Sequence, residues 1–149
     1  MEGKKRILVA PLDWGLGHAT RCIPIIKELQ KRNCEVFISS SSKVANLLKE
    51  EFPELKQFQL PAYNPLYPEG GSMVFNMAMQ VPHFVSVIRK EHAALNEIVK
   101  REKIDVIISD NRYGCYSKKV KSIFVTHQLH LLMPFKWMEF GVNTLNRSL

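Results

Sequence analysis

Apolar positions along the chain fall into two patterns, short continuous runs and stretches with helical spacing. The run from Arg6 to Ala10 is continuous, which predicts a buried strand. Beyond it, apolar residues recur every three or four positions from Cys22 to Leu29. This spacing predicts an amphipathic helix with Pro24 near its first turn, where a missing N–H costs little. The same patterns predict further strands at 35–38, 56–60, 104–109 and 123–125, and further helices over 44–48 and 81–99.

This alternation of strands and helices predicts a doubly wound, Rossmann-like α/β fold with a parallel sheet and helices on both faces. The serines at 39–42 predict a loop that offers an N-cap to the second helix. Residues 61–72, with three prolines and two glycines, predict an irregular surface segment. A short, tightly wound crossover is expected over 110–121. An apolar stripe runs from Phe135 to the end of the chain, so the domain 1–149 is expected to be a truncated piece with an absent packing partner.

Composition narrows the classes of function. The formal net charge is +7, but the basic residues are spread along the chain without a dense run. We interpret them as a solvated basic surface and expect no nucleic-acid partner. Three dispersed cysteines without C-x-x-C spacing argue against a disulfide framework and a zinc site, and no carboxylates have metal-site spacing. No apolar run reaches about 18 residues and no signal peptide precedes the first strand, so a cytoplasmic location is expected.

The segment 11–21 is the strongest candidate for a binding loop. It follows the first strand, at the sheet edge where open parallel sheets bind ligands. Gly15 and Gly17 allow the backbone to approach a ligand closely, and the helix that follows offers free N–H groups to an anion. Thr20 replaces the third glycine of a dinucleotide fingerprint, and no phosphate-loop lysine follows. His18 is positioned to act as a base or to donate a hydrogen bond to a phosphate or sugar hydroxyl; the alternative is a helix-capping histidine.

These residues carry a resemblance to a known family. Residues 11–36 resemble the opening of the GT-B glycosyltransferases, and within them the family 28, MurG-like N-acetylglucosaminyltransferases. Residues 125–128 (Val-Thr-His-Gln) are similar to the His-Glu-Gln step at the corresponding strand end of those enzymes. The matching positions in the first segment are Gly17, His18, Pro24, Leu29, Arg32, Val36 and Ser39.

The resemblance implies that the chain is the N-terminal, acceptor-binding half of an inverting glycosyltransferase. A missing C-terminal domain would bind the nucleotide-sugar donor, which serves as co-substrate, and no metal or other cofactor is implied. The acceptor would be a glycan or a lipid-linked molecule, and the sugar N-acetylglucosamine. His18 is then the candidate base or phosphate contact, and Gly15, Gly17 and Arg21 would line the substrate cleft. The fragment alone is expected to be inactive.

The sequence departs from the family at two loops. Asp13 and Trp14 stand where small residues are usual, so Asp13 is either an alternative base or a turn residue that bonds its own backbone. The set Asp110, Asn111 and Arg112 replaces a glycine-rich stretch. We interpret this charged loop either as a binding site for acceptor hydroxyls or phosphate, or as a cap on the crossover helix.

Further polar and apolar residues outside these loops also have expected places or roles. His127 and Gln128 end the last predicted strand and are expected to face the same edge as His18. His92 is interpreted as a packed boundary residue, and His83 receives no role. Apolar residues around 73–84 and 131–137 have basic neighbours, which suits either the inner face of a membrane or the missing domain.

Two other functions remain open. A nucleotide-sugar 2-epimerase has a similar fold, but its Gly-Thr-Arg-Pro loop is absent here. A non-catalytic binding subunit of a split glycosyltransferase would need no second domain in the same chain.

Overall fold

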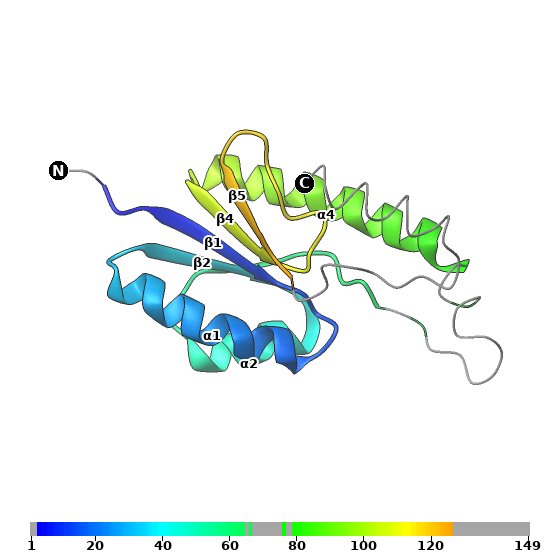
Figure 1. The fold of residues 1–149 in the computed structure, drawn as a ribbon, viewed down its shortest axis with the longest axis horizontal. Helices are drawn as coiled ribbons and strands as arrows, with labels where there is room; N and C mark the ends of the chain where they lie inside the picture. Colours follow the sequence, from blue (N-terminus) through cyan, green and yellow to red (C-terminus); the bar gives the residue numbers. More distant parts are fainter. Residues whose placement is uncertain (1–2, 65, 67–75, 77–78, 127–149) are drawn as a thin grey trace.

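The structure is a computed structural model and describes residues 3–64, 66, 76 and 79–126. Its centre is a sheet of five parallel strands in the order β3-β2-β1-β4-β5 (Figure 1). This is the α/β architecture that the alternating pattern predicts. The elements are β1 (Arg6–Pro11), α1 (Leu16–Lys31), β2 (Glu35–Ser40), α2 (Ser42–Glu51), β3 (Gln57–Gln59), α4 (Val81–Arg101), β4 (Val106–Asp110) and β5 (Lys121–Val125).

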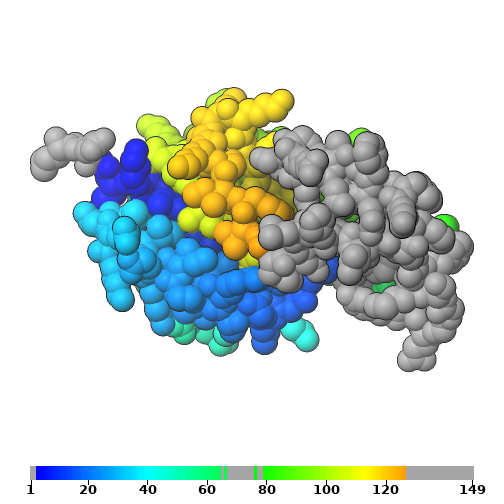
Figure 2. All heavy atoms as spheres, in the orientation of Figure 1, coloured from blue at the N-terminus to red at the C-terminus, as the bar shows by residue number. Residues whose placement is uncertain are grey.

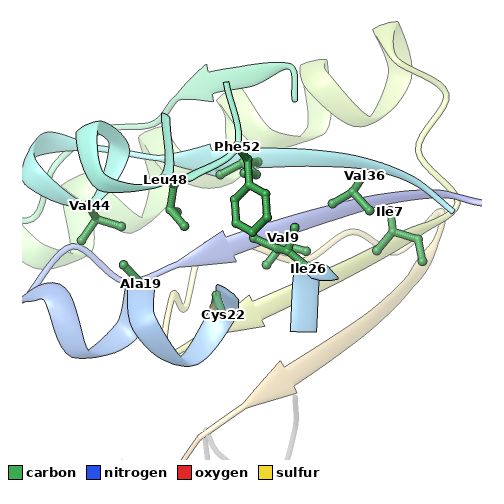
Figure 3. Packing of buried hydrophobic residues seen from close by; sticks show 10 residues of the cluster. Ile7, Val9, Ala19, Cys22, Ile26, Val36, Val44, Leu48 and Phe52 are labelled. Atoms are coloured by element: carbon green, nitrogen blue, oxygen red, sulfur yellow. The ribbon is translucent and has the colours of Figure 1, made fainter. Parts of the chain in front are cut away.

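Helices cover both faces of the sheet (Figure 1). On one face, the central strands pack against α1 and α2, and Figure 3 shows these side chains converging between the two layers. On the other face, a second cluster joins Leu8, Phe37 and Ile107 to Leu95 and Ile98 of α4. Because the central strands are buried on both faces, each reads as a continuous apolar run. The labelled residues of the first cluster are Ile7, Val9, Ala19, Cys22, Ile26, Val36, Val44, Leu48 and Phe52.

Helix α1 begins earlier than the sequence pattern indicates. Gly15 has φ 137°, a conformation that L side chains rarely adopt, and the helix starts at the next residue, Leu16. Pro24 therefore lies inside α1, and the prediction that it sits near the first turn was wrong. The residues Gly17 and His18 belong to the first turn of the helix.

Two smaller predictions were also wrong. Residues 111–120, between β4 and β5, form turns and contain no crossover helix. Their backbone is tied to α4 instead, through contacts described below. Ser41 does occupy the N-cap position of α2, but its side chain makes no capping hydrogen bond and donates to Asp13 at 2.8 Å. The predicted helix from Pro134 lies outside the described residues.

The strand order creates a switch point between β1 and β4. From β1 the chain moves outward to β2 and β3, and then returns across β1 to form β4 and β5. The connections that leave the carboxyl ends of β1 and β4 therefore diverge, which is the arrangement at which open α/β sheets bind ligands. No helix among the described residues is long and apolar enough to cross a membrane.

Candidate functional site

The register of β1 with β4 brings together the loops that follow these two strands. Pro11, the last residue of β1, pairs with Asp110, the last residue of β4, and the Leu12 amide donates to the Asp110 carbonyl at 3.0 Å. The loop after β1 then turns through Gly15 into α1. Apart from its chain neighbours and the backbone of its own helix, no described atom lies within 4 Å of where a Cβ on Gly17 would stand. The first turn of α1 thus has open space beside its backbone.

His18, Arg21 and Asp110 form a charged cluster at this point. His18 Nδ1 lies 2.9 Å from Asp110 Oδ2, and Arg21 contacts both oxygens of the same carboxylate at 3.1 to 3.3 Å. The side chain of Asp110 is 2% exposed, that of His18 15% and that of Arg21 36%. A buried carboxylate is therefore neutralised by a cation that itself reaches the surface.

The contacts at Nδ1 favour one tautomer of the His18 ring. Arg21 Nη2 also lies 2.9 Å from Nδ1, so this ring nitrogen faces an acceptor and a donor together. An N–H at Nδ1 donates to Asp110, and Arg21 keeps its Nε and Nη2 hydrogen bonds to the same carboxylate. A bare Nδ1 would instead place a lone pair against a buried anion. The Nδ1–H tautomer is thus favoured, in which Nε2 carries the ring lone pair.

Asp13 lies in the same loop and binds other segments of the chain. Its Oδ2 accepts hydrogen bonds from the Ser41 hydroxyl at 2.8 Å and from the Tyr63 amide at 3.3 Å. Its Oδ1 is buried and has no hydrogen-bond partner among the described residues. The carboxylate therefore joins the loops after β1, β2 and β3, and one of its oxygens retains acceptor capacity.

All three residues of the predicted charged loop, 110–112, are buried. Asp110 belongs to the cluster above. Asn111 is 6% exposed with φ 55°, and its amide donates to Val125. Arg112 is completely buried and forms an ion pair with Glu91 of α4. Its guanidinium is occupied inside the protein, so the structure places it behind the loop rather than at a ligand-facing surface.

Two serines to which the sequence reasoning gave no role in the site lie at the same edge. Ser39 and Ser40 end β2 and are at most 1% exposed, and neither hydroxyl has a hydrogen-bond partner among the described residues. The signal was present in the sequence as a polar end to an apolar strand. Glu91 was also missed, although it is a carboxylate within the apolar stripe of α4. His127 and Gln128 lie outside the described residues.

A buried thiol lies behind the cluster. Burial, and then the charge of Asp110, raise the pKa of Cys22 to about 12. Cys22 therefore stays protonated at neutral pH and is not a nucleophile. The remaining histidines of the described chain lie outside the cluster. His92 packs against Tyr116 with ring centroids 4.3 Å apart, and the exposed His83 has its Nε2 3.2 Å from the Tyr63 carbonyl.

The fold is similar to that of several solved structures. The glycosyltransferase of kitacinnamycin matches 97% of this chain and 35% of its own, with a TM-score of 0.62 and 17% identity. MurG of Acinetobacter baumannii matches 97% of this chain and 39% of its own, with a TM-score of 0.56 and 15% identity. The C-terminal domain of PF1911 hydrogenase from Pyrococcus furiosus matches 83% of this chain and 94% of its own, with a TM-score of 0.52 and 18% identity. No protein-family model and no curated protein matches the sequence.

The described structure is thus a Rossmann-like α/β domain with polar side chains gathered at its switch point. More particularly, it has the fold of a glycosyltransferase-like GT-B domain, as the resemblance in the sequence predicted. The chain spans 35% and 39% of the first two proteins compared above. Because the identities are low, the likeness establishes the fold, while the reaction has to be argued from the site.

Proposed function

We propose that this chain is the acceptor-binding half of an inverting glycosyltransferase. Its substrates would be a nucleotide-sugar donor and a hydroxyl of a glycan or lipid-linked acceptor. The contact between His18 and Asp110 at the switch point of a GT-B fold carries this proposal. A second domain, which the compared glycosyltransferases have room for in their longer chains, would bind the donor.

The chemistry follows from the tautomer of His18. Nε2 accepts the proton of the acceptor hydroxyl as the acceptor oxygen bonds to the anomeric carbon of the sugar. The bond from that carbon to the diphosphate breaks in the same step, and the nucleoside diphosphate leaves with its electron pair. Asp110 stabilises the imidazolium that forms on His18. The proposed step uses no metal or other cofactor.

Nearby groups suit a phosphate-bearing substrate. The N-terminus of α1 has no side-chain cap and no acidic residue in its first turn, so its amides and dipole favour an anion. Gly17 leaves open space beside this backbone. Arg21 adds a cation whose side chain is 36% exposed. These groups would contact either the leaving diphosphate or a phosphate of a lipid-linked acceptor.

The experiment is a transfer assay that measures nucleoside diphosphate release by the chain combined with its donor-binding half. His18→Ala is expected to lower kcat by about 10²- to 10⁴-fold, because the general base is lost. Asp110→Asn should lower it in the same direction. His83→Ala is the matched control, since this histidine is exposed on α4 and lies outside the cluster.

Asp13→Asn separates the two candidate bases. If His18 is the base, the Asp13 variant retains more activity than His18→Ala. Turnover near the wild-type rate in His18→Ala, with a large loss in Asp13→Asn, would move the role to Asp13. Near wild-type turnover in both variants would exclude general-base catalysis by this loop.

A further inference from the structure

The Glu91–Arg112 ion pair is fully buried, with both side chains 0% exposed. Burial alone lowers the pKa of Arg112, but the Glu91 carboxylate reverses this and holds the pKa above its ordinary value. The guanidinium is therefore charged. A buried ion pair is weak evidence for stability, because apolar residues of similar volume often replace one without loss. What this pair contacts is more informative.

One set of contacts ends at the loop that carries Asp110. Glu91 Oε2 accepts the Gly114 amide at 2.9 Å, and the Ser109 hydroxyl donates to the Arg112 carbonyl at 2.7 Å. A Cβ on Gly114 would stand 2.6 Å from Glu91 Oε2, so no larger residue fits between this loop and α4. The loop is thus fixed to α4 on the residues that directly follow Asp110.

A second set of contacts ends at the loop that carries Asp13. Arg112 donates to the carbonyl of Pro11 at 3.4 Å and to the carbonyl of Pro61 at 2.7 Å. Tyr63 donates its hydroxyl to Glu91 Oε2 at 2.8 Å, and its amide donates to Asp13 at 3.3 Å. Burial, and then the charge of Glu91, raise the pKa of Tyr63, so this hydroxyl remains a donor.

Both candidate bases are therefore connected to the same buried pair, His18 through Asp110 and Asp13 through Tyr63. Two apolar side chains could fill the volume of the pair, but they could not bind the carbonyls and amide at the ends of three different strands. We propose that Glu91 and Arg112 are positioning residues that hold the His18–Asp110 contact in the geometry needed for proton transfer. Their importance for catalysis rests on the proposed function, whereas their effect on His18 does not.

The test is nitrogen-15 NMR of the His18 ring, which distinguishes Nδ1–H from Nε2–H without any turnover. Wild type should show the Nδ1–H tautomer. Glu91→Gln should shift His18 toward a mixed tautomer, and Asp110→Asn should do the same. Glu102→Gln is the matched control, because Glu102 follows the same helix and also forms ion pairs. Its partners, Lys56 and Arg101, lie near the start of β3 and the end of α4, away from the candidate site. This variant should leave the His18 signals unchanged.

If Glu91→Gln does not fold, Glu91→Leu combined with Arg112→Met takes its place, since this double variant leaves no unpaired buried charge. A folded variant of either kind with wild-type His18 signals would overturn the proposal. In the transfer assay, the folded variant should lose about 10- to 100-fold in kcat with little change in KM for the acceptor. A tautomer shift in a protein without transferase activity would leave the positioning role intact and refute the proposed function instead.

Discussion

Two glycines at the candidate site serve opposite purposes. A Cβ on Gly114 would stand 2.6 Å from both Glu91 Oε2 and the Ile88 carbonyl. A Cβ on Gly17 would have no described atom within 4 Å besides its chain neighbours and its own helix backbone. Gly114→Ala should therefore lower the free energy of unfolding by about 1–3 kcal/mol through overpacking. Gly17→Ala should leave it unchanged or raise it by up to about 1 kcal/mol, because glycine is unfavourable within a helix.

Urea denaturation of the two variants beside wild type measures this difference. Equal stability of Gly114→Ala and wild type would mean that the loop after β4 can move away from α4. That result would also weaken the positioning role of Glu91. A large loss in Gly17→Ala would mean that this glycine is required by the fold, and its open space would then not be a sign of a ligand.

Sequence reasoning at the residue scale identified single groups but not their contacts. The glycine-rich loop indicated His18, because a histidine beside a turn at a helix start can act as a base or donate a hydrogen bond to a phosphate. It could not pair His18 with Asp110, because the two lie 92 residues apart and meet only through the register of β1 with β4. Arg112 was assigned either to acceptor contact or to a cap on a crossover helix, since nothing local in the sequence reveals that its partner is Glu91.

At the scale of elements, Glu102 ties the C-terminal end of α4 to the residues before β3. It accepts hydrogen bonds from Lys56 at 2.8 Å and from Arg101 at 2.9 Å, and these bonds lower the pKa of its carboxyl below the ordinary value of 4.5. A carboxyl whose folded pKa is depressed stabilises the protein above its unfolded pKa, and the contribution disappears as pH falls through the folded pKa.

Wild type should therefore be more stable than Glu102→Gln at neutral pH, and the two should converge as pH falls below about 4.5. Urea midpoints measured across this range test the expectation. Added salt should reduce the difference, since Lys56 and Arg101 are more than half exposed. A difference that stayed constant from neutral to acidic pH would show that the Glu102 charge is not its source.

The sequence predicted elements better than it predicted their boundaries. Continuous apolar runs located the central strands β1, β2 and β4, because buried parallel strands have few polar positions to confuse the pattern. The edge strands β3 and β5 also overlap predicted segments, although β3 reads Gln-Phe-Gln. The start of α1 was placed too late, since Gly17 and His18 carry no apolar signal and only Gly15 marks the turn. The expected crossover helix over 110–121 failed because long-range bonds to Glu91 hold that segment in turns.

At the scale of the whole molecule, the alternation of elements predicted the fold class but not the order of the strands. The order β3-β2-β1-β4-β5 decides which loops meet, and it places the ends of β1 and β4 on either side of the switch point. In the space-filling view, α1 (blue) and the segment that ends in β5 (orange) form much of one face (Figure 2). A surface of this kind is assembled from distant parts of the chain and has no signature in any one of them.

The same strand order predicts how stability is distributed. β1 is hydrogen-bonded on both sides and contributes to both buried clusters, whereas β3 has three residues and pairs only with β2. Amides of β1 should therefore exchange with solvent only through global unfolding, while those of β3 exchange through local opening at a lower free energy. Hydrogen exchange followed by mass spectrometry distinguishes the two strands. Equal protection of β3 and β1 would show that the sheet opens as one unit, and the site loops that leave β1 and β3 would then share the stability of the core.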